Sequence, residues 1–391
     1  MHSAGINPFE FSTVNRVIFG WGKATEVGLA VEEFGVDRVL LVTGDNAERC
    51  RFLFDDLQGR GMEFTVYQVS GEPTTETVTD GAKRAREVDC QLVVAVGGGS
   101  VIDAGKAIAA LANNERDVTD YLEVVGLGLP LDRDPLPLIA VPTTAGTGAE
   151  VTRNAVLGVP AHRVKVSMRS PRMLPDTAIV DPELTVSMPP AITASTGLDA
   201  LTHLMEVYLS KMANPMTDAF CRRGMACLAK SLRTAWCDGE NRSARESMAL
   251  ASLYGGFALA NAKLGAVHGF AGPLGGLCGA PHGQVCARLL PFVMRANLEA
   301  IPDQDAGKMV LSRYAEVAGI LTGGYEATPA SGVAWVERCC SEFDIPTLAD
   351  LGMKHDDVSD IVGQAMRSSS MQGNPMVLSE AVLKQILLDA C

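Results

Sequence analysis

Between Asp199 and His282, one carboxylate and three imidazoles stand at spacings that allow them to meet at a single divalent metal ion. Asp199 and His203 are four residues apart in GLDALTHLMEVYLS, so on a helix both side chains leave the same face, one turn apart. His268 and His282 follow in AVHGFAGPLGGLCGAPHGQV. One oxygen donor with three nitrogen donors suits Fe(II) or Zn(II), and such a site with room for a substrate oxygen acts as a Lewis acid.

The spacing alone leaves an alternative open. An Asp and a His four residues apart on a helix often arise by chance, and a single histidine is commonly a core or capping residue. From the residues alone, a metal site and a set of separate structural histidines are about equally favoured.

A second metal-binding pattern overlaps the first. Cys278, His282 and Cys286 read C-x-x-x-H-x-x-x-C, which would suit zinc if the segment were helical. Gly279 and Pro281 break any helix between Cys278 and His282, so we expect the two cysteines to be small core residues instead. The chain's ten cysteines lack the dense spacing of a disulfide framework, and reduced thiols are expected.

The elements that must position these residues differ between the two halves of the chain. Up to about residue 185, apolar runs alternate with helical patterns, which is typical of a parallel sheet covered by helices on both faces. The expected strands are RVLLVT (38–43), FTVYQV (64–69), QLVVAV (91–96) and LPLIAVP (136–142). From roughly residue 190, long helical windows replace the strand pattern.

We therefore predict an α/β domain with a parallel sheet over residues 1–187 and an all-α domain over residues 188–391. Pro189-Pro190 marks the boundary and leads into the next helix. Because ligands of such sheets bind at the carboxyl ends of the strands, the loops that follow the strands are the candidates for ligand binding.

The first such loop is glycine-rich. Gly97-Gly98-Gly99-Ser100 follows the strand QLVVAV and leads into the helical pattern VIDAGKAIAALA. Bare backbone N–H groups and the positive end of a helix dipole are what a pyrophosphate requires, and Gly98 also has the freedom to adopt a positive φ. The loop does not match G-x-G-x-x-G, and such glycines also allow tight packing, so both roles stay open.

Asp103 and Lys106 lie on the first turns of the same expected helix. For Asp103, the alternative to a role in ligand binding is a favourable interaction with the helix dipole. For Lys106, the alternative is a solvated charge with no other role.

The second loop carries hydroxyl groups. Thr143, Thr144 and Thr147 stand in PTTAGTGAE, directly after the strand LPLIAVP. Their hydroxyls offer donors and acceptors to a ribose or a nicotinamide amide. Thr and Gly are also routine loop residues, but two such loops at the same edge of the expected sheet favour a shared ligand.

Composition excludes several classes of function. The 391 residues carry a formal net charge of -13, which disfavours binding to the phosphates of nucleic acids. No run of about 18 apolar residues is long enough to span a bilayer, and the N-terminus lacks the basic and apolar regions of a signal peptide. We therefore expect a cytoplasmic protein with no nucleic-acid or membrane partner.

The chain resembles the iron-containing (group III) alcohol dehydrogenases, in which motifs like the ones above stand in the same order. The resemblance runs from VIFGWGKATEVG near the start to Asn374-Pro375 near the end. It implies an N-terminal dinucleotide-binding α/β domain and a C-terminal helical metal-binding domain, with cofactor and metal facing each other in a cleft. It also implies a homodimer, and it makes Asp199, His203, His268 and His282 the ligands of Fe(II) or Zn.

The resemblance also assigns contacts to NAD or NADP. Residues 97–100 would hold the pyrophosphate, and the three threonines would lie along the nicotinamide end. Asp103 matches the acid of the family's GGGS-x-x-D motif, and Lys165 matches a cofactor-contacting lysine. Glu72, in SGEPTT, stands where relatives contact the adenosine half.

Two departures from the family matter. Many members read HG-x-x-H-P-L-G, with an extra histidine near the substrate, whereas this chain has Gly272 at that position. Strict NAD users often carry an acid at the end of the strand that RVLLVT represents. Here Gly44 stands first and Asp45 follows: Asp45 suits NAD, while Gly44 with Arg49 nearby would admit NADP, so the preference stays open.

The implied chemistry is hydride transfer between a nicotinamide and an alcohol, aldehyde or ketone whose oxygen a metal polarises. One alternative is a maleylacetate-type reductase on the same fold, which the intact Asp and His set disfavours. Another is a lyase like dehydroquinate synthase, for which we expect more basic residues than Lys211, Lys263 and Arg288 around the metal ligands.

Overall fold

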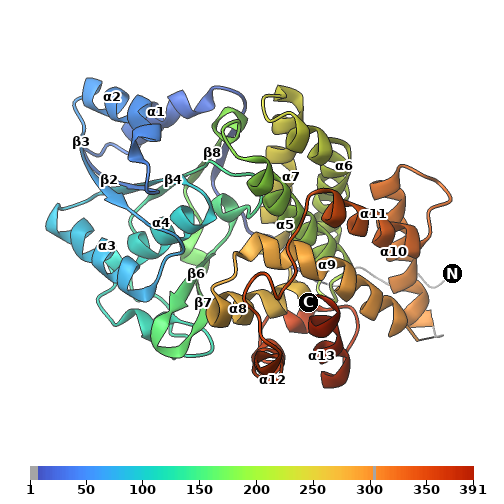
Figure 1. Ribbon diagram of the computed structural model, residues 1–391. Coiled ribbons are helices and arrows are strands. Elements are labelled where there is room, and N and C mark those ends of the chain that lie inside the picture. The colour runs from blue at the N-terminus through green and yellow to red at the C-terminus, as the bar shows by residue number, and fades with distance from the viewer. Residues whose placement is uncertain (1–7, 303–304) are drawn as a thin grey trace. The chain divides into compact units, whose positions relative to one another are not determined.

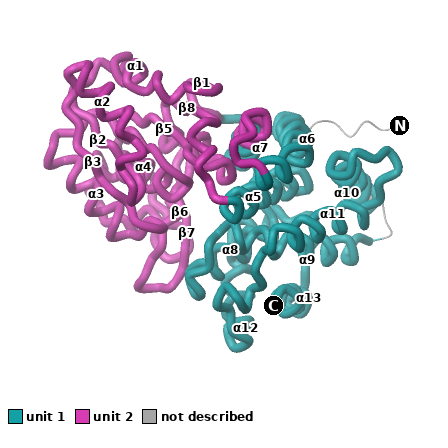
Figure 2. Tube along the Cα trace, turned by 45° about the horizontal axis from the view of Figure 1, so that its top comes forward, with its two compact units in different colours: residues 1–12, 190–237, 250–391 teal, residues 13–189, 238–249 magenta. Residues whose placement is uncertain are grey.

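The computed structural model describes residues 8–302 and 305–391, and the chain divides into two compact units (Figure 2). One, here called the sheet unit, comprises residues 13–189 and 238–249. The other, here called the helical unit, comprises residues 190–237 and 250–391 together with the N-terminal residues up to Ser12.

The sheet unit contains a six-stranded sheet whose paired strands all run parallel. In chain order its strands are β1 (Arg16–Phe19), β2 (Arg38–Thr43), β3 (Glu63–Gln68), β4 (Leu92–Gly97), β5 (Leu138–Pro142) and β8 (Thr177–Val180). The predicted parallel sheet is confirmed. The sequence did not indicate β1 and β8, which are four residues each, or the antiparallel pair β6 (Asn154–Val159) and β7 (Val164–Arg169).

Helices cover both faces of this sheet (Figure 1). Leu40, Val93 and Ala95 point into a core formed with α3 (Thr75–Glu87) and α4 (Gly99–Ala112). The residues next to these along β2 and β4 point to the opposite face of the sheet, into a core formed with α1 (Val27–Glu32) and α2 (Arg51–Gly59). This alternation explains why the strands read as continuous apolar runs.

The strand order, β1-β8-β5-β4-β2-β3, places the glycine-rich loop at a ligand-binding position. The chain moves outward from β2 to β3 and then crosses back to β4 on the other side of β2, so the order reverses between β2 and β4. Such a switch point opens a crevice at the carboxyl ends of the two strands. Gly105 lets α4 lie close on β4, because a Cβ there would stand 2.6 Å from the Cβ of Ala95.

In the helical unit the described residues form no strands. Its helices are α5 (Pro190–Leu209), α6 (Pro215–Cys237), the later part of α7 (Arg242–Ala260), α8 (Ala266–Cys278), α9 (His282–Glu299), α10 (Asp305–Thr322), α11 (Pro329–Glu342), α12 (Val358–Ala365) and α13 (Glu380–Asp389). The start of α5 at Pro190 agrees with the predicted lead-in. α5 packs against α6 and α9 and is buried over most of its length, so its polar side chains must find partners inside the unit.

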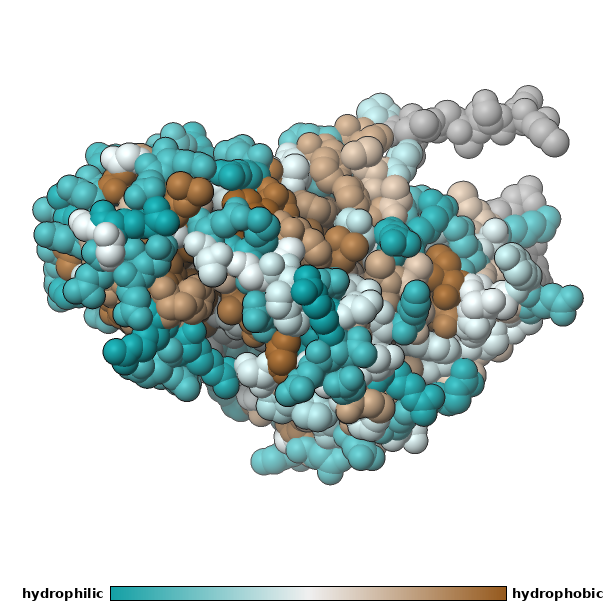
Figure 3. Space-filling view, turned by 90° about the horizontal axis from the view of Figure 1, so that it is seen from above, coloured by the Kyte–Doolittle hydropathy of each residue, from teal (hydrophilic) through white to brown (hydrophobic). Residues whose placement is uncertain are grey.

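No helix among the described residues is long and apolar enough to cross a membrane. On the face drawn in Figure 3, apolar residues are interspersed with hydrophilic ones.

Candidate metal and cofactor sites

Four side chains of the helical unit converge on one point. The donor atoms of Asp199, His268, His282 and Cys286 all lie within 4.8 Å of one another. They come from three helices, α5, α8 and α9. Three of these four residues are predicted metal ligands. The fourth, Cys286, was expected to be a small core residue; it is buried, and its sulfur lies among the donors.

The distances in this four-donor group suit a tetrahedral metal ion. Oδ1 of Asp199 lies 3.6 Å from Nε2 of His268 and 3.5 Å from Nε2 of His282. Sγ of Cys286 lies 3.7 Å and 3.6 Å from the same two nitrogens. Zinc bonds of about 2.3 Å to sulfur and about 2.0–2.1 Å to nitrogen or oxygen give tetrahedral edges of about 3.6 Å and about 3.3–3.4 Å. These four separations are therefore close to those that one tetrahedral ion requires.

Asp199 supplies independent support for a cation. The residue is 1% exposed, and its Oδ1 has no hydrogen-bond partner within the described part of the chain. Leaving a buried carboxylate oxygen unsatisfied is costly, and a bound cation removes that cost.

The pKa shifts of these residues also favour positive charge at the group. Burial raises the pKa of Asp199, but the three imidazoles around it more than reverse this and hold it below its usual range. Burial lowers the pKa of His282, while Cys286 and Asp199 raise it more, to about 9. The pKa of His268 is raised well above its usual value, against burial, by Cys286, Asp199 and Glu206. The acidic neighbours thus favour positive charge at this point of the helical unit.

The break between α8 and α9 places two of the donors. α8 ends at Cys278, followed by Gly279 at φ 66°, and α9 begins at His282 after Pro281. The predicted helix break is confirmed, and Cys278 does not belong to the four-donor group. His282 and Cys286 are instead four residues apart within α9, so they share one face of that helix.

His203, the remaining predicted ligand, lies beside the four-donor group and is not part of it. It is 3% exposed on α5, and its ring stacks on His268 with centroids 4.4 Å apart and 29° between the planes. Its charge also contributes to the lowered pKa of Asp199. The structure thus brings all four predicted ligands together, while the role of His203 as a ligand stays a prediction.

Glu206 is a functional residue that sequence reasoning missed. Its Oε2 lies 2.7 Å from Nδ1 of His268 and can accept a hydrogen bond from it, an arrangement that directs Nε2 of that ring toward the group. Glu206 also accepts backbone hydrogen bonds from Gly265 at 2.9 Å and Val267 at 2.7 Å. One buried carboxylate therefore contacts both the start of α8 and a histidine of the candidate metal group. The signal in the sequence was its position one turn after His203 on the same helix.

The Asn374-Pro375 motif also has a structural role here. Oδ1 of Asn374 accepts the backbone N–H of Ala266 at 3.2 Å, and its Nδ2 donates to Oδ1 of Asn297 at 2.7 Å. Asn374 thus satisfies another free N–H at the start of α8.

In the sheet unit, the two predicted cofactor loops are adjacent. The backbone N–H of Thr143 donates to the carbonyl of Gly97 at 2.9 Å. A Cβ on Gly98 would stand 3.4 Å from Cγ2 of Thr144, and one on Gly99 would stand 2.6 Å from Cγ2 of Thr147. Gly98 has φ −71°, so the positive φ considered for it is not used. The glycines fit against the threonine loop, and the pyrophosphate role stays a prediction.

Lys106 is buried, so the alternative that it is a solvated charge is wrong. Its Nζ donates to the carbonyl of Ala149 at 2.9 Å and to Oγ1 of Thr152 at 3.0 Å, and it lies 3.0 Å from Oδ1 of Asp103. Oδ2 of Asp103 accepts the backbone N–H of Val156 at 2.9 Å. Both side chains therefore tie α4 to the segments after the threonine loop.

The other predicted cofactor residues have these partners. Nζ of Lys165 on β7 lies 2.5 Å from Oε2 of Glu72, so these two predicted contacts form an ion pair with each other. Gly44 directly follows β2, and the side chain of Asp45 accepts a hydrogen bond from Ser70. Their contact with a nucleotide stays a prediction.

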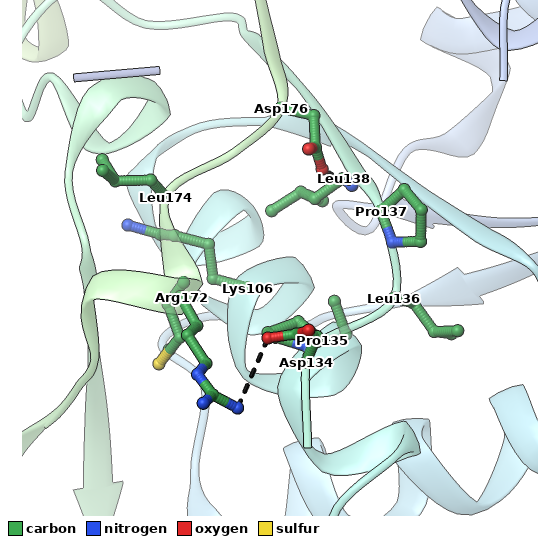
Figure 4. A pocket seen from close by; sticks show the side chains of 11 residues that line it. Lys106, Asp134, Pro135, Leu136, Pro137, Leu138, Arg172, Leu174 and Asp176 are labelled. Carbon is green, nitrogen blue, oxygen red and sulfur yellow. Dashed lines mark hydrogen bonds and ion pairs between the residues drawn. The ribbon is translucent and has the colours of Figure 1, made fainter. Parts of the chain in front are cut away.

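A pocket of about 240 Å³ in the sheet unit lies away from these loops (Figure 4). Its lining includes Pro137 and Leu138 at the start of β5 and Asp176 just before β8, so it lies at the amino ends of these strands. Its charged groups are paired: Arg172 with Asp134 at 3.3 Å, and Asp176 with the backbone N–H of Leu138 at 2.9 Å. It is therefore not the expected nucleotide crevice.

Comparisons with known proteins show the family of the chain. A family model described as iron-containing alcohol dehydrogenase matches residues 14–182, and one described as the C-terminal part of the Fe-containing alcohol dehydrogenase family matches residues 193–391. The chain therefore belongs to the iron-containing alcohol dehydrogenase family, and it is an oxidoreductase of the alcohol dehydrogenase class.

Individual relatives match along nearly the whole chain. It is 37% identical over 391 residues to a 1,3-propanediol dehydrogenase of Klebsiella pneumoniae, covering 98% of each chain. It is 32% identical over 380 residues to an NAD-dependent methanol dehydrogenase of Bacillus methanolicus, covering 95% of this chain and 97% of that one. A solved structure of 1,3-propanediol oxidoreductase is similar with a TM-score of 0.90 at 35% identity, covering 98% of this chain and all of that one (100%).

Proposed function

We propose that this protein is a metal-dependent NAD(P) alcohol dehydrogenase or aldehyde reductase. The convergence of Asp199, His268 and His282 on one point of the helical unit carries the proposal. This convergence favours binding of a divalent ion over a purely structural histidine cluster, and a divalent ion at this point would act as a Lewis acid.

Asp199, His268 and His282 would hold Fe(II) or Zn, with a fourth donor beside them. His203 is the fourth ligand that the family resemblance implies. When bound, the metal polarises an alcohol or carbonyl oxygen, and the nicotinamide accepts or gives the hydride. Glu206 would keep His268 in the tautomer that can bind a cation.

The sheet unit would supply the cofactor site. Residues 97–100 would receive the pyrophosphate on backbone N–H groups at the start of α4, and the threonine loop would line the nicotinamide end. Asp103, Lys165, Glu72, Gly44 and Asp45 are proposed to contact or border the rest of the nucleotide. The proton of the alcohol must leave by another group than residue 272, because glycine offers no imidazole there.

Two other activities compete with this one. A maleylacetate-type reductase of the same fold would not require the complete donor group, and a lyase like dehydroquinate synthase would require more basic residues for a phosphorylated substrate. The preserved donor group and the net charge of -13 favour the alcohol dehydrogenase.

Metal analysis and a substrate panel test the proposal. Protein purified without chelator is expected to carry iron or zinc and to transfer hydride between NAD or NADP and small alcohols, observed at the nicotinamide absorbance. 1,3-Propanediol and methanol are the first probes, because relatives are named for them. Chelation should abolish turnover, and added metal should restore it. Full turnover by metal-free protein would contradict the proposal.

We further propose that the enzyme is a cytoplasmic homodimer with small-molecule substrates. Light scattering of the purified protein tests the oligomeric state, and a monomer at micromolar concentration would contradict it.

A further inference from the structure

We propose that Asn297 and Tyr314 are positioning residues of the proposed metal centre, which hold the start of α8, and with it His268, where that ligand can bind the ion. Both residues act through the side chain of Asn374. This inference rests on the proposed metal-dependent function and adds to it a set of residues that stand behind the ligands. All of these residues belong to the helical unit.

The start of α8 depends on side chains from elsewhere in the chain, because Gly265, the residue before the helix, has no side chain to cap it. Glu206 accepts the backbone N–H groups of Val267 and His268, at 2.7 and 3.4 Å. Asn374 accepts the first N–H of the helix, at 3.2 Å. A Cβ on Gly265 would stand 2.7 Å from Oε1 of Glu206 and 3.0 Å from Oδ1 of Asn374, so the glycine makes room for both caps.

Asn297 fixes the orientation of the Asn374 amide. Nδ2 of Asn374 donates to Oδ1 of Asn297 at 2.7 Å and to the carbonyl of Met376 at 2.8 Å, and Nδ2 of Asn297 donates back to Oδ1 of Asn374 at 3.3 Å. Turning the Asn374 amide over would point its own N–H groups at the N–H of α8 and break these bonds. Both amides are buried, so each broken bond would leave a polar group without a partner.

Tyr314 joins this network from α10. Its side chain is 2% exposed and shares a hydrogen bond with Asn297. Burial raises the pKa of Tyr314 above its usual range; the bond with Asn297 opposes the shift, and the nearby charge of Glu206 adds to it. The hydroxyl group therefore stays protonated throughout the neutral range and keeps its hydrogen bond with the Asn297 amide.

These contacts tie together the helices that carry the predicted ligands. Glu206 lies on α5 with Asp199, and Asn297 lies on α9 with His282, while the groups that both networks of bonds reach are at the start of α8. A site whose donors come from three helices keeps its geometry only if the helices keep their places. Buried amides that merely filled the core would carry the cost of desolvation without this return.

Zinc affinity, measured on the full-length protein by competition with a chelator, tests this role. Asn297→Ala frees the Asn374 amide, so we expect the affinity to fall by about 10–100-fold. Tyr314→Phe removes one hydroxyl and keeps the ring, so it should give a smaller loss in the same direction, and it remains as the test if Asn297→Ala does not fold. The visible absorption of Asn297→Ala loaded with Co(II) should also differ from that of wild type, because the geometry around the ion changes.

Asn214→Ala is the matched control. Asn214 is also a buried asparagine of the helical unit, but its Oδ1 caps α6, where it accepts the backbone N–H groups of Met216 and Thr217 at 3.1 Å each. No member of the four-donor group lies on α6. This variant should lower the unfolding temperature of the metal-free protein and leave the zinc affinity and the Co(II) spectrum unchanged.

Two results would overturn the inference. One is wild-type zinc affinity in folded Asn297→Ala or in Tyr314→Phe, which removes that residue from the role. The other is an equal loss of affinity in Asn214→Ala, which would show a general loosening of the unit. In a wild type with metal-dependent hydride transfer, either result refutes this inference alone, whereas hydride transfer without any metal would refute the proposed function.

Discussion

The sheet unit and the helical unit build their candidate sites in different ways. The cofactor loops of the sheet unit consist of backbone and small side chains at the ends of neighbouring strands. The two loops fit against each other because the glycines have no side chain. The metal group of the helical unit consists of side chains from three helices far apart in the sequence. The first kind of site tolerates no added bulk, and the second tolerates no missing donor.

Two buried carboxyls show the same contrast. Glu150 follows the threonine loop of the sheet unit and is 2% exposed; burial raises its pKa to about 7, although Lys106 opposes the shift. Asp199 is as buried, but its imidazole neighbours lower its pKa. Only the carboxyl of the helical unit is therefore charged throughout the neutral range, as a metal ligand must be.

The largest effect is expected from His282→Ala. Loss of neighbours that merely orient metal ligands already costs about 10–100-fold in affinity or activity, so loss of a direct donor should cost more than about 100-fold in turnover. Metal analysis should find the ion lost, while dinucleotide binding, measured by fluorescence titration, stays within twofold of wild type. Normal metal content and normal turnover would remove His282 from the site.

Gly98→Val should produce the opposite pattern. A branched side chain next to Thr144 blocks the approach of a pyrophosphate to the backbone, so we expect dinucleotide affinity to fall by about 100-fold while metal content is retained. Gly59→Val, on an exposed position of α2 where a Cβ meets no atom within 4 Å, is the control. An unchanged dissociation constant in Gly98→Val would mean that these glycines serve packing only.

The third change concerns the buried carboxyl of the sheet unit. The folded-state pKa of Glu150, about 7, lies above its unfolded value of 4.5. Between these two pH values the unfolded state has lost the proton that the folded state keeps, so stability falls as pH rises through this window, by at most about 3 kcal/mol. Glu150→Gln cannot ionise and should lack this loss.

Urea unfolding of wild type and Glu150→Gln across this pH window measures the difference. The variant should gain stability relative to wild type as pH rises toward 7 and keep that gain above it. Glu63→Gln, which replaces a glutamate at an exposed position, is the matched control. Parallel curves for Glu150→Gln and wild type would show that the carboxyl is not protonated in the fold.

The sequence predicted more of the sheet unit's fold than of the helical unit's site. Apolar runs gave four of the parallel strands because burial on both faces leaves a local pattern, whereas the four-residue strands β1 and β8 are too short to leave one. The histidines of the candidate metal group were indicated by type and spacing. The spacing of Cys286 from His282 was also visible, but the sequence favoured a core residue there. Glu206 was not indicated, because its contacts with α8 arise only when α5 and α8 meet, and no spacing along the chain encodes that meeting.

Glu206→Gln tests how far the metal group depends on support from outside it. An amide keeps the shape but loses the charge and one of the accepting oxygens, so we expect metal affinity to fall by about 10–100-fold. Competition with a chelator measures it. If Glu206 only caps α8, Glu206→Gln should instead lower the unfolding temperature of the metal-free protein. Asn374→Asp, which alters the neighbouring cap, provides the comparison. Unchanged metal affinity in Glu206→Gln would leave Glu206 as a cap alone.

The smallest effect is expected from Gly44→Asp, which probes cofactor choice in the sheet unit. A Cβ at Gly44 meets only Cγ2 of Val101, at 3.8 Å, so the substitution fits the fold. A carboxylate there would face the 2′-phosphate of NADP. At an effective dielectric of about 20, two unit charges about 4 Å apart repel by about 4 kcal/mol before screening. A third of that energy shifts the NADP to NAD ratio of kcat/KM about tenfold toward NAD. If wild type already rejects NADP, Asp45 is the residue that excludes it, and Gly44 has no part in the choice. The ratio of kcat/KM for the two cofactors, measured on wild type, Gly44→Asp and Asp45→Ala, separates these cases.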